Sequence, residues 1–171
     1  MNAGEKPVQT LIRPLNSSDW EAVGRIYLEG LRTGNATFEE SVPPWPDWDR
    51  SHLPFARLVA EVGRIIVGWA ALSPVSSRCV YAGVAEVSFY VGAEHCGFGI
   101  GRALMEELIA GSERSGIWTL QAGVFPENAA SLHVLEDCGF RIVGRRERLA
   151  KISGVWRDVI LLERRSTTVG I

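Results

Sequence analysis

The sequence predicts one domain of the α/β (α+β) class, a mixed and mostly antiparallel β-sheet with helices on both faces. Two observations predict it. Runs rich in β-branched and aromatic residues alternate with runs whose apolar residues recur at helical spacing. A chain of 171 residues is also long enough to bury about two thirds of its unfolded surface in one core. We therefore interpret residues 1–171 as a single domain, with a loose leader at 1–7 and a loose tail at 165–171.

The first third of the chain is predicted to hold a strand, a long helix and an irregular connection. Residues 8–13 form a short strand, and residues 17–19 favour a helix start, with Ser18 and Glu21 spaced as a capping box. The helix ends near Gly34. Residues 35–54 contain four prolines and two tryptophans, with one short helix expected after Pro46. A connection of this length inside a domain is commonly functional.

The rest of the chain alternates strands and helices. A hairpin of residues 57–62 and 64–72 is followed by a loop at 74–83 and a strand at 85–91. A helix then fades around Gly116, a strand covers 118–124, and a second helix runs from Asn128 to Gly139. A final hairpin joins residues 140–148 to 155–163. The predicted order is β-α-α-β-β-β-α-β-α-β-β.

A glycine-rich turn connects the strand at 85–91 to the helix that follows. Gly97, Gly99 and Gly101 occupy every second position of the turn. Such a turn leaves backbone N–H groups unpaired at the positive end of the helix dipole, which suits a phosphate group. Glycine also allows positive φ and close approach of a ligand to the backbone. The spacing fits neither the dinucleotide fingerprint nor the Gly-Lys-Ser/Thr phosphate loop, and a plain tight turn is the alternative.

The turn resembles the acyl-CoA pyrophosphate loop of the GNAT acetyltransferases, Arg/Gln-x-x-Gly-x-Gly/Ala, in the segment that begins at Cys96. Cys96 replaces the usual Arg or Gln, which removes one polar side chain near the phosphates. The order of predicted elements is also the GNAT order. The resemblance implies acetyl-CoA as cosubstrate, without a metal. It implies that the following residues bind the cofactor: Phe89, Tyr90, Val91, Gly97, Phe98, Gly99, Ile100, Gly101 and Arg102.

The helix from Asn128 supplies a second match. GNAT enzymes carry Asn-x-x-Ser/Ala with Gly-Phe eleven residues after the Asn, and Gly139 stands at that spacing here. The resemblance implies that Asn128 and Ser131 contact the cofactor, whereas a plain helix with an Asn cap is the alternative. Relatives often have a Tyr or His that protonates the departing thiolate where this chain has Leu135. His133 lies about 200° around the helix from that position. A thiol with a pKa around 8.5 can leave without an acid.

A third set of residues narrows the family. Arg78, Tyr81 and Glu86 are spaced as in the phosphinothricin, methionine sulfoximine and arsinothricin acetyltransferase branch, which the segments 35–39 and 154–159 also resemble. The similarity covers roughly residues 10–164. It implies acetyl-CoA-dependent N-acetylation of the α-amine of a small glutamate-like amino acid, by a homodimer. A peptide or protein N-acetyltransferase and a non-catalytic acyl-CoA-binding module are the alternatives.

The strand that carries Glu86 suggests how the amine is activated. Glu86, Ser88 and Tyr90 share one face of this strand, which is otherwise apolar. Glu86 is then either an edge charge or a general base that takes a proton from the substrate ammonium, and partial burial would raise its pKa toward a useful value.

The other residues of this set suit an anionic amino acid. The guanidinium of Arg78 is suited to a carboxylate or phosphinate, or else it is a solvated side chain. Tyr81 orients the same anion or packs. Phe38 walls the pocket, and Glu39 binds an ammonium group or is a surface charge. We expect these residues to bind the substrate: Phe38, Glu39, Arg78, Tyr81 and Ser88. Trp156, Arg157 and Asp158 are expected to have a structural or dimer role.

Composition does not indicate nucleic acid, a membrane or a metal ion as a binding partner. A net charge of −2, from 18 basic and 20 acidic residues, does not indicate nucleic-acid binding. The longest apolar stretch, residues 65–72, is too short to cross a bilayer, so we expect no membrane contact. Three cysteines without C-x-x-C spacing indicate a reduced, cytoplasmic location and no metal site.

Overall fold

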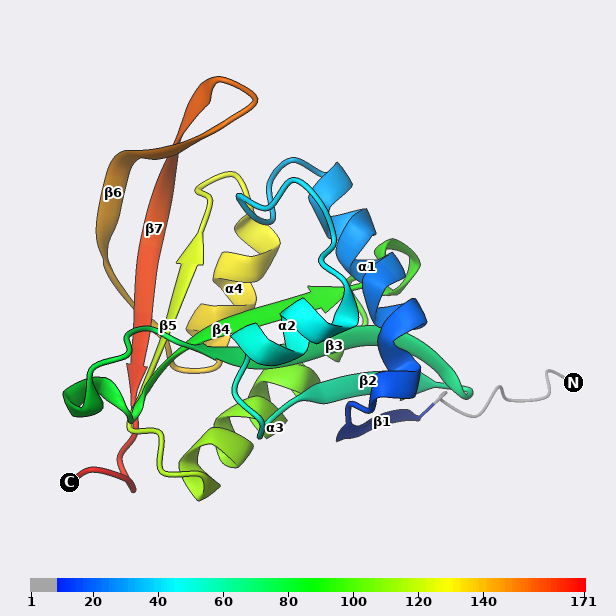
Figure 1. The fold of residues 1–171 in the computed structure, drawn as a ribbon, viewed down its shortest axis with the longest axis horizontal. Coiled ribbons are helices and arrows are strands. Elements are labelled where there is room, and N and C mark those ends of the chain that lie inside the picture. The colour runs from blue at the N-terminus through cyan, green and yellow to red at the C-terminus, as the bar shows by residue number, and fades with distance from the viewer. Residues whose placement is uncertain (1–8) are drawn as a thin grey trace, which may run out of the picture.

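The computed structural model describes residues 9–171 and contains one seven-stranded sheet with helices on both faces (Figure 1). The strand order is β1-β2-β3-β4-β5-β7-β6. Only β4 and β5 pair in parallel, and the other neighbours are antiparallel, which confirms the predicted mixed sheet. The strands are β1 (Thr10–Pro14), β2 (Leu58–Val62), β3 (Ile65–Pro74), β4 (Val84–Val91), β5 (Thr119–Val124), β6 (Arg141–Ile152) and β7 (Val155–Arg165). The predicted leader at 1–7 lies outside the described residues.

Two helices cover each face of the sheet. They are α1 (Trp20–Arg32), α2 (Trp45–Ser51), α3 (Ile100–Arg114) and α4 (Ala129–Asp137). One core packs α3 and α4 against the sheet and includes Leu104, Leu108 and Leu135. The other lies under α1 and α2 and is aromatic, with Tyr27, Trp48 and Trp69. Successive strand residues point to opposite faces, so β3 and β4 contribute to both cores.

The start of α1 differs from the prediction. A 3₁₀ turn at Ser17–Asp19 precedes the helix, and the backbone N–H of Asn16 donates to the Asp19 carboxylate at 2.8 Å. The capping box predicted at Ser18 and Glu21 is therefore wrong, because the turn moves the cap two residues earlier. Arg13 donates to both Asp19 carboxylate oxygens, at 2.8 and 3.0 Å, and this contact is the main reason why the pKa of Asp19 lies below its usual value.

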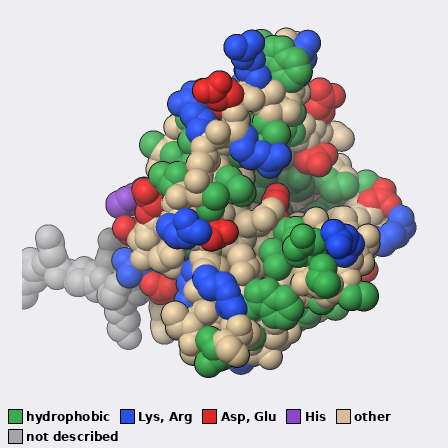
Figure 2. Space-filling model, turned by 90° about the vertical axis from the view of Figure 1, so that its left-hand side faces the viewer, with side chains coloured by type: hydrophobic (Ala, Val, Ile, Leu, Met, Phe, Trp, Pro, Cys, Tyr) green, Lys and Arg blue, Asp and Glu red, His purple; other side chains and the backbone are tan. Residues whose placement is uncertain are grey.

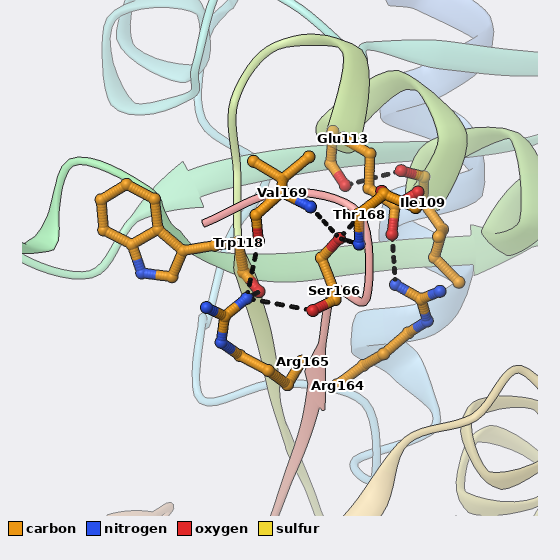
Figure 3. A network of polar contacts seen from close by, with 9 residues as sticks. Ile109, Glu113, Trp118, Arg164, Arg165, Ser166, Thr168 and Val169 are labelled. Atoms are coloured by element: carbon orange, nitrogen blue, oxygen red, sulfur yellow. Dashed lines mark hydrogen bonds and ion pairs between the residues drawn. The ribbon is translucent and has the colours of Figure 1, made fainter. Parts of the chain in front are cut away.

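The C-terminal tail is attached, in contrast to the loose tail expected from the sequence (Figure 3). Ser166 is only 5% exposed, and its N–H donates to the Trp118 carbonyl at 2.8 Å. Its hydroxyl accepts hydrogen bonds from the N–H groups of Thr168 and Val169, both at 3.1 Å. The contact with Trp118 is long-range, and the small polar residues of the tail give no local signal for it.

The β6–β7 hairpin forms the far edge of the sheet and extends beyond the other strands (Figure 1). Most of β6 is exposed. Figure 2 shows hydrophobic side chains among interspersed basic and acidic ones at the top of the molecule, where this hairpin lies. The exposed apolar side chains of β6 and β7 are Ile142, Val143, Leu149, Val155 and Trp156.

Candidate active site

The parallel strands β4 and β5 separate part-way along their length. They pair only at Val84–Thr119, Ala85–Leu120 and Glu86–Gln121. Beyond this point the two strands diverge, and α4 lies near the opening (Figure 1). The edge of β4 from residue 87 to residue 91 therefore faces β5 without a strand partner there, while its other edge stays paired to β3. An unpaired strand edge can hydrogen-bond an extended ligand. We call this opening the splay.

Glu86 stands at the vertex of the splay, in the last residue pair that joins β4 to β5. Its Oε2 accepts a hydrogen bond from Gln121 Nε2 at 2.9 Å. Its Oε1 has no hydrogen-bond partner among residues 9–171, and the side chain is exposed. The partial burial expected for Glu86 is thus not observed. Gln121 was missed by the sequence analysis, because only the parallel pairing of two distant strands brings it beside Glu86.

The faces of β4 follow the predicted alternation. The pairing of β4 with β3 is regular from Ala85 to Val91. Phe89 and Val91 pack with the α3–α4 core, whereas Tyr90 packs with the aromatic core under α1. Glu86 and Ser88 share the Tyr90 face by strand geometry. Polar groups of β4 therefore lie on the α1 side of the splay, and apolar groups on the α3 side.

The Tyr90 ring is tightly held. It stacks on Trp69 with ring centroids 4.8 Å apart and lies 4.9 Å from the Tyr27 ring. Burial is the main cause that raises the pKa of Tyr90, and the nearby Tyr27 phenol raises it further, so this phenol stays protonated. Burial is also the largest cause that raises the pKa of Tyr27, and for both phenols the Glu39 carboxylate raises the pKa while Thr37 lowers it.

The glycine turn has the geometry expected of an anion-binding loop. Gly97 and Gly99 have φ of +84° and +78°, and a Cβ at either would meet nothing within 4 Å. Along α3, the first backbone N–H with a backbone acceptor is that of Ala103, which donates to the Gly99 carbonyl at 3.0 Å. The N–H groups of residues 100–102, in the first turn of α3, thus have no backbone acceptor, and the space beside Gly97 and Gly99 is open. This arrangement fits a phosphate group.

Neighbouring side chains shape the approach to this loop. Phe98 is 77% exposed, and the Arg102 side chain pairs with Glu106 at 2.8 Å on the surface. The Cys96 thiol points back to the turn, with Sγ 3.6 Å from the Gly92 carbonyl. Glu29 of α1 accepts a hydrogen bond from the Ala93 N–H at 2.9 Å and so fixes the start of the turn. Backbone groups, more than side chains, are therefore presented for binding.

Asn128 caps α4 and also reaches across the splay. Its Oδ1 accepts the Ser131 N–H at 3.1 Å, and its Nδ2 donates to the Asn35 carbonyl at 3.2 Å. The helix-cap interpretation is therefore observed. The second bond ties α4 to the segment that follows α1.

Phe38 and Glu39 lie on this same segment. The Phe38 ring packs edge-to-face on Phe125 at the end of β5, with centroids 4.9 Å apart. Glu39 is exposed, yet its charge acts on Tyr27 and Tyr90. The segment thus joins the Tyr90 face of β4 to the end of β5.

Arg78 and Tyr81 lie beside each other. The Arg78 guanidinium lies 5.6 Å from the centroid of the Tyr81 ring, and both side chains are exposed. They belong to the segment between β3 and β4, which projects from one end of the sheet (Figure 1). Within residues 9–171 no hydrogen bond joins Arg78 to Glu86. Their role as an anion clamp stays a prediction.

Two of the surface cavities can be placed by the residues that line them. One of about 580 Å³ lies between β1, the start of β2 and the end of α3, and none of the predicted site residues lines it. The other, of about 460 Å³, lies between Asn35, Glu127 and β7. Across residues 9–171, no group of three His, Cys, Asp or Glu residues could hold a metal ion. The same residues include no helix with the length and apolar character needed to cross a membrane.

Comparison with known proteins identifies the family. A model of the acetyltransferase (GNAT) family matches residues 20–140. The chain belongs to the GNAT acetyltransferases. It is 34% identical over 163 residues to phosphinothricin N-acetyltransferase of Alcaligenes faecalis, covering 90% of this chain and 81% of that protein. It is 29% identical over 114 residues to the L-methionine sulfoximine/L-methionine sulfone acetyltransferase of Salmonella typhimurium, 67% of each chain.

A solved GNAT structure confirms the fold. The phosphinothricin acetyltransferase of Sinorhizobium meliloti, in complex with acetyl-CoA, matches with a TM-score of 0.84 at 24% identity, over 94% of this chain and 90% of that one. The predicted family and enzyme class are therefore confirmed, and the protein is an acyltransferase.

The chain departs from the GNAT pattern at one position that matters for chemistry. Leu135, where many GNAT enzymes have a Tyr or His, is fully buried in the α3–α4 core. His133 is on the outer surface, 77% exposed, with Nε2 3.5 Å from an Asp137 carboxylate oxygen. Neither side chain is placed to donate a proton in the splay.

Proposed function

We propose that this protein is an acetyl-CoA-dependent N-acetyltransferase of the α-amine of a small glutamate-like amino acid. Phosphinothricin, methionine sulfoximine and arsinothricin are the substrates that the resemblance suggests, and the first two are named for its relatives. The observation that carries the proposal is the position of Glu86, a carboxylate with one free oxygen at the vertex of the splay. In this role Glu86 is the general base.

Acetyl-CoA would be held on the α3 side of the splay. The unpaired N–H groups at the start of α3 suit its pyrophosphate, and the free edge of β4 suits its extended arm. Because Gly97 and Gly99 carry no Cβ, the backbone can approach the phosphates closely. When bound, acetyl-CoA supplies the acetyl group as a thioester.

The amine would approach from the other side, along the Glu86, Ser88 and Tyr90 face. Glu86 Oε1 takes one proton from the ammonium group, and the amine lone pair then forms a C–N bond to the thioester carbonyl carbon. The C–S bond breaks, and sulfur leaves as thiolate. The second amine proton passes to the thiolate or to water. Because Glu86 is exposed, its own proton returns to solvent.

No side chain needs to act as a general acid in this scheme. Leu135 cannot donate a proton, and a thiol with a pKa around 8.5 is a tolerable leaving group as thiolate. Gln121 has a positioning role, since its amide holds Oε2 and leaves Oε1 toward the amine.

Glu86→Gln tests the proposal, because it keeps the shape of the side chain and removes the base. We expect kcat to fall by about 10²–10⁴-fold, with acetyl-CoA affinity nearly unchanged and the acidic limb of the pH–rate profile flattened. The assay is CoA thiol release below the pKa of the amine, with phosphinothricin, methionine sulfoximine and a peptide as acceptors.

Glu21→Gln on the exposed face of α1 is the matched control, since it removes the same charge away from the splay. If Glu86→Gln keeps more than about a third of wild-type kcat with an unshifted profile, the base is elsewhere. Release with the peptide alone would indicate a peptide acetyltransferase, and acetyl-CoA binding without any release would indicate a binding module.

We further infer a homodimer. The resemblance implies it, and the exposed apolar side chains of the β6–β7 hairpin are candidates for the contact. Light scattering should give twice the 18.8 kDa of one chain, and the mass of a single chain would exclude the dimer.

A further inference from the structure

The segment of residues 33–39 crosses the splay, and we call it the covering segment. It follows α1 and reaches toward the turn between β5 and α4 (Figure 1). Three hydrogen bonds, from donors on β7 and at the start of α4, hold this segment in place. Arg157 Nη1 donates to the Gly34 carbonyl and Nη2 to Asn35 Oδ1, both at 2.8 Å, and Asn128 Nδ2 donates to the Asn35 carbonyl at 3.2 Å. The first two come from one side chain of β7.

The Arg157 side chain is largely buried and packs against an aromatic ring. It is 17% exposed, and its guanidinium lies 4.4 Å from the centroid of the Phe125 ring. Nη2 also lies 3.1 Å from Glu127 Oε2, and this contact helps to lower the pKa of Glu127, after the backbone N–H of that residue. The charge is therefore compensated, and the planar fork satisfies three acceptors at once.

The covering segment carries side chains that lie near the Glu86, Ser88 and Tyr90 face of β4, along which the amine is proposed to approach. We call this face the amine side of the splay. Phe38 packs on Phe125, and the Arg157 guanidinium lies over the same ring. Thr37 and Glu39 act on the phenols of Tyr27 and Tyr90, which share the Glu86 side of β4. The glycine turn predicted to bind acetyl-CoA lies on the opposite side, where Gly101 faces the apolar side chains of β4 and α4. Two other predicted cofactor contacts differ: Tyr90 packs in the aromatic core under α1, and Asn128 donates to the covering segment.

We propose that Arg157 is a positioning residue that holds the covering segment over the amine side and so sets the affinity for the acceptor amine, without affecting that for acetyl-CoA. The inference rests on the proposed function. If the segment is not held, each binding event must first order it, and that cost weakens the apparent affinity. The cost applies only to the ligand that the segment contacts.

Arg157→Lys is the informative variant. It keeps the positive charge and the pairing with Glu127. However, an ammonium group cannot present two parallel donors to Gly34 and Asn35 or stack flat on Phe125. Arg164→Lys is the matched control. Arg164 is also on β7, its side chain is 22% exposed, and it pairs with one carboxylate, that of Glu113 at 2.9 Å (Figure 3).

The first measurement is hydrogen exchange in the ligand-free protein. The N–H groups of Gly34, Asn35 and Glu39 all have acceptors within residues 31–37. Loss of charge-assisted hydrogen bonds should speed their exchange by about tenfold in Arg157→Lys and leave it unchanged in Arg164→Lys. Unchanged exchange in Arg157→Lys would overturn the inference, whatever the substrate.

The second measurement separates the two ligands. Arg157→Lys should raise KM for the accepted amine by about tenfold, with kcat and the calorimetric Kd for acetyl-CoA within about twofold of wild type. Arg164→Lys should lower Tm without changing either constant. Asn35→Ala removes the Nη2 contact from the other end, so its effect on KM should not add to that of Arg157→Lys.

An equal loss of affinity for both ligands would mean that Arg157 only stabilises the fold, and would overturn the inference. A wild-type protein that acetylates none of the amines would refute the proposed function, and with it the part of the inference that concerns the amine. The exchange result decides independently whether Arg157 holds the covering segment.

Discussion

Two glycines in α1 allow a matched test of the packing around Tyr90. An ideal Cβ at Gly30 would lie 2.5 and 2.6 Å from Cδ1 and Cε1 of the Tyr90 ring. The ring cannot move away easily, since it is stacked on Trp69 and flanked by Tyr27. A Cβ at Gly24 would meet only Val42 Cγ1, at an ordinary 3.7 Å. Both glycines lie inside the same helix.

The expected magnitudes follow from these distances. Replacing Gly by Ala inside a helix favours folding by about 1 kcal/mol, so Gly24→Ala should raise Tm by roughly 2–4 °C. Gly30→Ala has the same gain, but overpacking costs about 1–3 kcal/mol. We therefore expect Gly30→Ala to be less stable than Gly24→Ala by about 2 kcal/mol, or roughly 4–8 °C.

Thermal and urea unfolding of the two variants measure this difference. The most informative measurement repeats Gly30→Ala in a Tyr90→Ala background, in which the ring that the new Cβ would contact is absent. There the substitution should stabilise by about 1 kcal/mol, as at Gly24. Equal stability of Gly24→Ala and Gly30→Ala in the wild-type background would refute the close contact, and a penalty that persists without the Tyr90 ring would refute its assignment to that ring.

Two further predictions concern the glycine turn and acid stability. Gly99→Val should weaken acetyl-CoA binding at least tenfold, about 1.4 kcal/mol, because Gly99 has a φ of +78° that a β-branched residue resists; unchanged calorimetric affinity in a folded variant would exclude the site. The pKa of Glu113 is lowered below its usual 4.5 chiefly by Arg164. Its contribution to stability is complete above that value and lost as pH falls through the folded-state pKa. Glu113→Gln should therefore weaken the pH dependence of urea unfolding below about pH 5, and an unchanged slope would contradict the ion pair.

The sequence determined the features that depend on neighbouring residues. Gly97 and Gly99 take the positive φ that their spacing suggested, and Asn128 caps the helix that it begins. The alternation along β4 follows from the period of two of any strand. Local backbone sterics and short-range hydrogen bonds decide these features, so they can be predicted without the rest of the molecule.

The start of α1 and the tail show where local signals are insufficient. Ser18 and Glu21 have the spacing of a capping box, yet Asp19 is held instead by Asn16 and by Arg13 of β1. The tail has no apolar run to predict attachment, but Ser166 is buried against Trp118. At the start of α1, competing contacts between residues three and six positions apart replace the predicted cap, whereas a long-range contact to Trp118 attaches the tail.

The candidate site itself was decided by tertiary structure. Gln121 reaches Glu86 across 35 positions, because β4 and β5 pair in parallel for three residues and then diverge. Arg157 meets Asn35 across 122 positions, because β7 lies beside β5. Leu135 faces the core rather than the splay. Residue types and spacing along the chain predicted which groups the chemistry needs. Strand order and register, which depend on burying two separate cores at once, determined which of those groups meet.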